Sequence, residues 1–276
     1  MTQRSIDDQS AGLMSFGGHL EVLRRMLFRI IIVVSVLSCV IFCFKDGVFR
    51  ILLAPREYDF CTFRIIERLI NSLGWDFRFS EYHIPLINTQ LSSQFMIHIT
   101  TSCILGVLCA SPYILAELFC FISPALYQQE KKYSYLVAVI VYILFVLGVL
   151  MSYFILFPIS FQFLGTYQVS DDITNTITLD SYISTFTTLT FMLGVVFQLP
   201  VLAFILGKMG LIDAALLSKY RPYAFVLIMI IAAVITPPDI FTLILCTIPI
   251  YALYELSILV LKKWGPARPE LPEETV

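Results

Sequence analysis

Six long apolar segments, separated by polar stretches, dominate the chain. A helix needs about 20 mostly apolar residues to cross a bilayer, and an extended backbone would leave its polar groups unpaired in lipid. The pattern therefore predicts an all-α integral membrane protein with six spans, at about residues 22–44, 91–119, 133–157, 179–206, 223–235 and 240–261.

The polar segments complete this organisation. Residues 1–264 are expected to form a single six-span membrane domain, and the tail 265–276, with its prolines and acids, is expected to be disordered. The longest polar segment, 47–90, combines aromatic residues with balanced charge. We expect it to form a loop outside the membrane, with short helices of its own.

The segment 223–235 is too short for an ordinary span. At 1.5 Å per residue it reaches only about 20 Å, against a hydrocarbon core of about 30 Å. Either this helix thins the bilayer or lies beneath a water-filled depression, or it begins nearer Lys219 with Pro222 in its first turn. The sequence favours neither interpretation.

Prolines interrupt the apolar segments, at positions 112, 158, 200, 222, 237, 238 and 249. Each removes a backbone donor, and a proline inside a helix also kinks it. Pro237, Pro238 and Asp239 form an abrupt turn before the last segment. We expect a bent bundle whose two final spans are short.

Composition supports lipid as the solvent of this chain. Hydrophobic residues make up 58% of it and charged residues 14%, whereas soluble domains have about 45–50% and about 25%. The net charge of −2 argues against a nucleic-acid partner, because such a protein needs a basic face.

The loop charges predict an orientation. Six spans leave both termini on one side, and the loops of that side carry twelve of the 18 Lys and Arg residues. The other six basic residues lie in the 47–90 loop or at its start, among as many acids. Basic loops stay in the cytoplasm, so both termini and the loop 121–132 are expected to be cytoplasmic.

The sequence contains no catalytic or nucleotide-binding motif of the kinds HExxH, GxSxG or GxxxxGK[ST]. His19, His83 and His98 are scattered, which makes a metal site improbable. We therefore expect neither an enzyme nor a cofactor.

Five polar side chains could still carry function, and each has a simpler explanation. Glu21 suits an ordinary helix start, and Glu130 could be a solvated loop charge beside a lysine. Glu117 and Glu255, near the cytoplasmic ends of spans, could reach the surface along their own stems. Gln198 lies inside the fourth span, where an amide either joins helices or lines a polar path.

Six motifs, in order, resemble the TatC family, the multispan receptor subunits of the twin-arginine protein translocase. They are HLEVLRRML, SPYILAELFCFISPALYQQEKK, YFILFPISFQFL, GVVFQLPV, KYRPYAF and ITPPDIFT. The resemblance extends over residues 18–264. It implies a concave, glove-shaped six-span bundle in the bacterial cytoplasmic membrane, with both termini in the cytoplasm.

The resemblance also implies binding residues and partners. The glutamate after PALY, here Glu130, would contact the arginine pair of signal peptides on folded cargo, on a surface shaped by Phe121 and Pro124; Pro55 matches a family position in the first external loop. Small single-span subunits of the TatA and TatB type would be partners, in a complex with several copies of the chain, and the proton-motive force would drive transport.

Two positions depart from the family pattern. The family usually starts HLxELR, with a signal-binding glutamate where this chain has Val22, and the acid here is Glu21. One residue is about 100° around a helix, so either Glu21 acts from a shifted direction or Glu130 acts more alone. A frequent intramembrane glutamate is replaced by Gln198, which cannot ionise but can form a hydrogen bond with a partner subunit.

A small-solute secondary transporter is the alternative function. Such proteins often show two repeated halves with paired broken helices and an ionisable residue near the midplane. This sequence shows neither a repeat nor a clear midplane charge. The alternative is therefore the weaker hypothesis.

Overall fold

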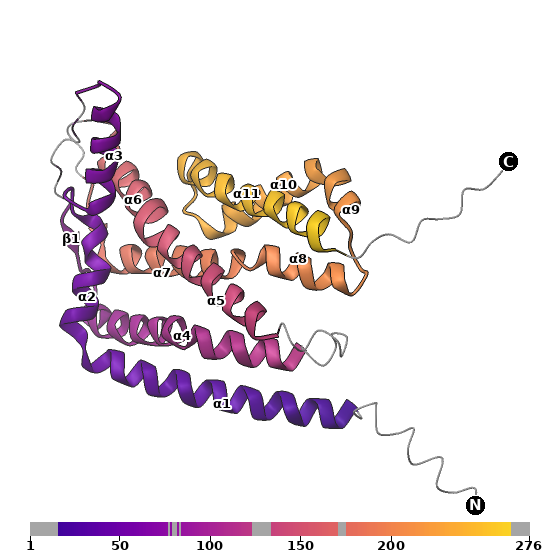
Figure 1. Ribbon diagram of the computed structural model, residues 1–276. Helices are drawn as coiled ribbons and strands as arrows, with labels where there is room; N and C mark the ends of the chain where they lie inside the picture. The colour runs from indigo at the N-terminus through magenta and orange to yellow at the C-terminus, as the bar shows by residue number, and fades with distance from the viewer. Residues whose placement is uncertain are drawn as a thin grey trace, which may run out of the picture.

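The computed structural model describes residues 16–76, 78, 82, 84–122, 134–170 and 175–265. Almost all of the regular structure in these ranges is helical, and five helical stretches are long and apolar enough to cross a membrane. They are Leu20–Cys43, Ser93–Leu118, Val137–Thr166, Leu179–Lys208 and Ile240–Lys263. We call the end of the bundle at which the first helix begins the N-side, which lies to the right in Figure 1.

The first two spans are continuous helices. Helix α1 (Phe16–Cys43) packs chiefly against α4 (Ser93–Ile122), which returns beside it to the N-side (Figure 1). The two helices approach closely at Gly106, where an added Cβ would lie 2.1 Å from Ser38 Oγ. Most of the remaining surface of α1 is exposed and apolar, as expected for a helix that faces lipid.

A proline changes the hydrogen bonding of the third span. This span consists of α5 (Ser134–Met151), a π-helical turn η4 (Ser152–Leu156) and α6 (Phe157–Thr166), with Pro158 in the first turn of α6. Proline has no N–H to donate to the carbonyl four residues earlier, which is that of Phe154. The hydroxyl of Thr62 donates to this carbonyl instead.

The fourth span is divided in the same way. Helix α7 (Leu179–Val196) ends just before Phe197 and Gln198, and α8 (Leu199–Lys208) follows with Pro200 in its first turn. Helical hydrogen bonds from Phe197 N to Leu193 O and from Leu202 N to Gln198 O remain on the two sides of the break. Gln198 thus lies at a bend inside the span.

The last part of the chain comprises three helices: α9 (Ala214–Lys219), α10 (Arg221–Ile235) and α11 (Ile240–Trp264). Helix α10 begins at Arg221 with Pro222 in its first turn, yet at 15 residues it is shorter than each of the five helical stretches that are long enough to cross a membrane. The expectation of two short final spans is wrong for α11, which has 25 residues. Its internal proline, Pro249, does not end the helix, because α8 and α10 pack along it.

The side opposite the N-side is covered by the segment between α1 and α4. It contains α2 (Lys45–Leu53), the 3-10 turn η1 (Ala54–Arg56), α3 (Cys61–Ser72) and β1 (Leu86–Ile87), which pairs in parallel with β2 (Ile177–Thr178). Pro55 is buried in η1. The hydroxyls of Tyr153 and Tyr182 donate to the carbonyls of Ile51 and Leu52, at 2.8 and 2.9 Å.

An aromatic core joins this cover to the spans. Phe157 lies edge-on to both Tyr182 and Phe186, with ring centroids 5.0 and 4.9 Å apart, and Leu52 is buried in the same cluster. A second core, around Leu156, Leu193 and Ile250, holds α10 and α11 against η4 and α7. The first core thus attaches the covering segment to the spans, and the second joins the last two helices to the third and fourth spans.

The crossing of α5 and α7 gives the first prediction. A Cβ at Gly148 would lie 2.7 Å from Leu193 O and 2.9 Å from Gly194 Cα, both backbone atoms that cannot rotate away. Gly148→Ala should therefore lower the free energy of unfolding by about 1–3 kcal/mol. Gly47→Ala is the matched control, since nothing lies within 4 Å of its added Cβ. Equal melting temperatures of the two variants in detergent would contradict the packing.

Candidate functional site

The acid near the start of α1 is exposed. Glu21 Oε1 accepts from Arg24 Nη2 at 3.3 Å and from Arg25 Nε at 3.1 Å, one turn further along the same helix. The side chain of Glu21 is 41% exposed, and those of the two arginines are 67% and 75% exposed. Exposed pairs of this kind contribute only about 0.2–1 kcal/mol, so other guanidinium groups can replace these partners.

Glu117 has a different environment. Its Oε2 accepts from Arg29 of α1 at 2.9 Å and its Oε1 accepts from Tyr113 at 2.8 Å, one turn earlier on α4. The side chain is only 16% exposed. Glu117 therefore connects the first two spans. The simpler explanation from the sequence, that its side chain extends to the surface without a partner, does not apply.

Glu255 forms a similar connection between the last two helices. Arg221 at the start of α10 donates to both of its carboxylate oxygens at 2.8 Å, and Tyr251 donates to Oε1 at 3.1 Å. Two-pronged contacts between arginine and carboxylate are among the strongest hydrogen bonds in proteins. Tyr254 adds a bond from its hydroxyl to Leu217 O at 2.7 Å, which holds α9 to α11.

Two of the predicted signal-binding residues, Glu130 and Pro124, lie outside the described residues, and Phe121 is in the last turn of α4. Helix α4 ends at Ile122 and α5 begins at Ser134, both on the N-side (Figure 1). The segment that carries Glu130 therefore joins two helices at the end of the bundle where Glu21 lies.

Gln198 has one satisfied and one unsatisfied polar atom. Its Nε2 donates to Val141 O of α5 at 3.1 Å, which ties the bend of the fourth span to the third. Its Oε1 is buried and has no hydrogen-bond partner within the described ranges. An unsatisfied buried acceptor costs about 1–3 kcal/mol, so a donor from outside would be favourable.

The turn before α11 is a cap. Asp239 Oδ1 accepts from Thr242 N at 2.6 Å, and the carboxylate thereby caps the helix start. Pro238 is exposed and Pro237 partly buried. Asp239 thus caps the start of α11, and no described contact connects it or the two prolines with Glu21.

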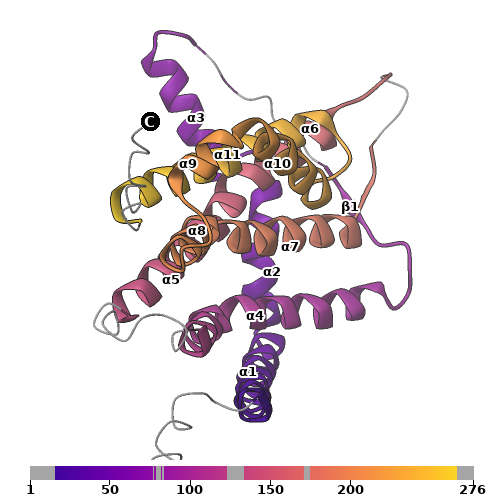
Figure 2. The ribbon, with the colours of Figure 1, turned by 90° about the vertical axis from the view of Figure 1, so that its right-hand side faces the viewer.

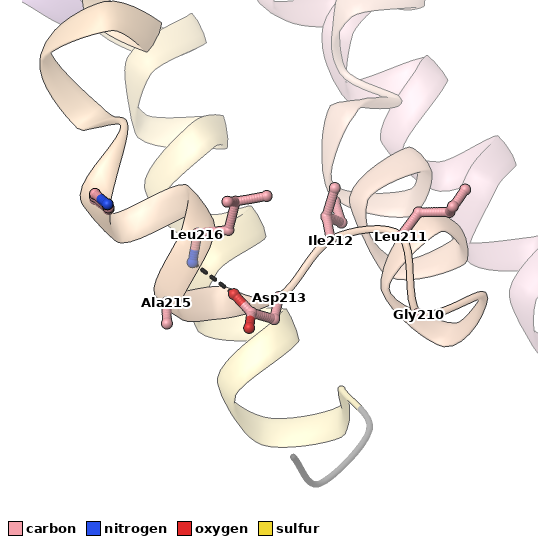
Figure 3. A pocket seen from close by; sticks show the side chains of 7 residues that line it. Gly210, Leu211, Ile212, Asp213, Ala215 and Leu216 are labelled. Carbon is pink, nitrogen blue, oxygen red and sulfur yellow. Dashed lines mark hydrogen bonds between the residues drawn. The ribbon is translucent and has the colours of Figure 1, made fainter. Parts of the chain in front are cut away.

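One hollow is also present on the N-side, at the turn between α8 and α9 (Figure 3). It has a volume of about 370 Å³ and is lined by residues 210–213, 215, 216 and 219. Its acid, Asp213, caps α9 by accepting from Leu216 N at 2.5 Å (Figure 3). In the described ranges, no group of three or more His, Cys, Asp and Glu side chains could hold a metal ion.

Comparison with known proteins identifies the family. The family described as "Sec-independent protein translocase protein (TatC)" matches residues 18–249. The chain belongs to the TatC family. It is similar to the TatC of a Blattabacterium, with 35% identity over 249 residues that cover 89% of this chain and 94% of that one. It is also similar to TatC of Desulforapulum autotrophicum, with 33% identity over 94% of this chain and 88% of that one.

A solved structure agrees with this assignment. The crystal structure of the "Twin Arginine Translocase Receptor- TatC" matches with a TM-score of 0.71 and 32% identity, over 89% of this chain and 98% of that chain. The predicted family, all-α membrane fold and role are thus confirmed. This TatC chain is a multi-pass membrane subunit of the twin-arginine translocase and a component of protein transport.

The pair between the first two spans of this TatC chain gives the second prediction. Arg29→Glu and Glu117→Arg should each lower the unfolding free energy, because each places two like charges side by side. The double exchange should recover about 1 kcal/mol relative to the sum of the two single changes, the scale of polar contacts between membrane helices. Melting curves in detergent would measure the recovery, with Arg25→Ala as a control expected to change little, since its pair is exposed and lies within one helix. If the changes in unfolding free energy of the two single variants simply added up in the double variant, Arg29 and Glu117 would not interact.

Proposed function

We propose that this chain recognises the twin-arginine signal peptides of folded proteins with Glu130 and Glu21, on the cytoplasmic face of the bacterial inner membrane. The observation that carries the proposal is the difference among the N-side acids of the described ranges. Glu117 and Glu255 each bind an arginine of a neighbouring helix and a tyrosine, and Asp213 caps a helix. Glu21, by contrast, is held by exposed arginines of its own helix.

The chemistry of the arginine pair in the signal peptide suits this surface. A guanidinium group is always charged, and its planar fork matches the two oxygens of a carboxylate. Partly shielded from bulk water at a membrane surface, such a pair is stronger than the same pair in solution. An incoming arginine that replaces Arg24 or Arg25 at Glu21 breaks only a weak exposed contact.

The charge distribution supports the proposed orientation. The described N-side ends of the helices carry Lys208, Lys219, Lys262 and Lys263, together with the arginines near the start of α1. Because positive loops remain in the cytoplasm, this side is cytoplasmic, and both termini lie there. The membrane domain has six spans over residues 1–264, with α10 as the fifth, followed by the tail 265–276.

Small single-span translocase subunits are the proposed membrane partners. The side chain of Gln198, at the break between α7 and α8, is only partly buried. A rotation that brings its Oε1, which has no partner among the described residues, to the surface would let it accept a hydrogen bond from a polar side chain on such a subunit. Several copies of the chain assemble in the working complex, and the proton-motive force drives transport.

The third prediction tests signal binding. Glu130→Ala should reduce photo-crosslinking of a twin-arginine signal peptide by about tenfold, the scale of one lost charge-assisted hydrogen bond, and Glu130→Lys should reduce it further. If the two acids share the site, adding Glu21→Ala should lower crosslinking below that of Glu130→Ala. Glu57→Ala is the control, because this exposed acid lies on the opposite side beside Arg56. Undiminished crosslinking by a correctly inserted Glu130→Lys chain would reject the role.

The fourth prediction concerns Gln198. Gln198→Leu removes both the bond to Val141 and the free acceptor, whereas Gln198→Glu keeps an acceptor. We expect Gln198→Leu to lose most of the co-purifying single-span subunits, and Gln198→Glu to retain them. Co-purification from membranes in mild detergent measures this, with Thr187→Val, whose hydroxyl bonds within its own helix, as a control. If equal amounts of the single-span subunits co-purified with the Gln198→Leu and Gln198→Glu variants, Gln198 would not contact these subunits.

A further inference from the structure

Helix α3 projects from the bundle on the side opposite the N-side. In Figures 1 and 2 it extends past the neighbouring helices, crosswise to α1, with its start near the bundle and its end away from it. It follows η1 and leads through a turn at Gly74, where φ is +88°, to Trp75. The later turns of α3 therefore overhang the ends of the spans.

The apolar face of α3 is buried at one end and bare at the other. Thr62 and Phe63, in the first turn, are 7% and 1% exposed. Ile65, Leu69 and Leu73 follow at helical spacing, and their exposure rises from 52% to 59% and 77%. Trp75, just beyond the helix, is 74% exposed. We call Ile65, Leu69, Leu73 and Trp75 the overhanging stripe.

The remaining face of α3 is polar. It carries Arg64, Glu67, Arg68 and Asn71, and Arg64 pairs with Asp59. The guanidinium of Arg64 lowers the pKa of the Asp59 carboxyl below its ordinary value, so this pair stays charged near neutral pH. A helix with one apolar and one charged face lies at a boundary between an apolar and an aqueous phase.

The first turn of α3 is held to the bundle by several contacts. Thr62 bonds to the carbonyl of Phe154, and Phe63 lies edge-on to Tyr82 at 6.3 Å. Phe60, just before the helix, stacks on Phe154 with ring centroids 5.8 Å apart. These contacts set the direction in which α3 leaves the bundle.

The overhanging stripe continues the apolar exterior of the spans. Helix α3 packs on η4, whose Phe154 and Ile155 are 37% and 42% exposed on the side of a membrane-spanning helix. The surface that meets lipid on the span thus runs up to the helix that carries the stripe. A tryptophan at its end fits the same position, because Trp prefers the boundary between headgroups and acyl chains.

We propose that α3 lies in the outer interface of the bilayer, with the overhanging stripe inserted among phospholipid headgroups and upper acyl chains. This second attachment to the membrane lies outside the six spans and holds the π-helical turn of the third span, through Thr62 and Phe154, at a fixed depth. The proposal rests on the membrane location of the chain and is independent of signal binding.

The chain contains only two tryptophans, Trp75 and Trp264, which allows a direct test. Trp264→Phe leaves Trp75 as the sole tryptophan of the full-length chain. The variant is reconstituted in vesicles of phosphatidylcholine and phosphatidylglycerol whose acyl chains are brominated either near the glycerol or near the chain ends. We expect Trp75 fluorescence to be quenched several-fold more by bromine near the glycerol, and to be protected from aqueous acrylamide.

Other occupants of the stripe give different results. If the stripe binds another protein that is absent from the vesicles, Trp75 would lie in water. Its emission would then be red-shifted and strongly quenched by acrylamide, and brominated lipid would have no effect on it. A stripe that meets a second copy of the chain would show lipid quenching only when the protein is diluted in the membrane. Either result would overturn the proposal.

Two further variants separate insertion from folding. Leu69→Gln with Leu73→Gln, in the Trp264→Phe background, should shift Trp75 emission to the red and abolish most of the bromine quenching. Arg68→Gln, on the charged face, is the matched control and should leave both signals unchanged. Because Leu69 and Leu73 are exposed, the melting temperature in detergent should not change. Unaltered bromine quenching in the double variant would show that the stripe does not hold Trp75 in the interface.

Discussion

The third span depends on a hydrogen-bond donor from outside it, because a proline leaves one of its backbone carbonyls without the usual helical partner. Pro158 cannot donate to Phe154, and the hydroxyl of Thr62, nearly a hundred residues earlier in the chain, replaces that donor. An unsatisfied carbonyl in lipid costs several kcal/mol, so this bond is a strong constraint. It requires α3 to start beside the π-helical turn, and the tyrosine bonds from Tyr153 and Tyr182 to the backbone of α2 complete the attachment. The segment that covers this side is thus held to the third span at its π-helical turn and to the fourth span at Tyr182.

The sequence predicted the elements well because lipid leaves few alternatives. Apolar length specified the long spans. The orientation that the loop charges predict stays a prediction. The break at Pro200 agrees with the expectation that prolines interrupt the spans. The start of the fifth span, which the sequence left open, lies at Arg221, with Pro222 in the first turn of α10. The bounds predicted for the last span, about 240–261, lie close to those of α11 (Ile240–Trp264), so only its description as short was wrong. Pro249 lies inside this helix without ending it, and α8 and α10 pack along the helix.

The site could be predicted only in part, since its contacts join residues far apart in the chain. Glu117 and Arg29 are 88 positions apart, and the local sequence around either residue does not predict the bond between them. A weak signal existed in the spacing of Tyr113 and Glu117, which places the hydroxyl and the carboxylate one turn apart on α4. Tyr251 and Glu255 repeat that spacing on α11, and again the acid binds an arginine from another helix. A tyrosine four residues before an acid near a span end is a useful sign of such a contact.

The described contacts join the third and fourth spans to each other at several depths, whereas the first span packs chiefly against a single neighbour, α4. The third and fourth spans are joined at three levels, by Gln198 to Val141, by close packing at Gly148 and Gly194, and by the hydroxyls of Ser152 and Thr190 at 3.1 Å. Helix α1 packs chiefly against α4, with the bond from Arg29 to Glu117 near the N-side and the contact of Ser38 with Gly106 deeper in the membrane. Glu21 precedes Arg29 by two helical turns, or about 12 Å, so it lies beyond the last bond that fixes α1 to its neighbour. In the proposed binding mode, an arginine at Glu21 would therefore contact α1 beyond this bond, while the bond at Glu117 keeps the first span against α4.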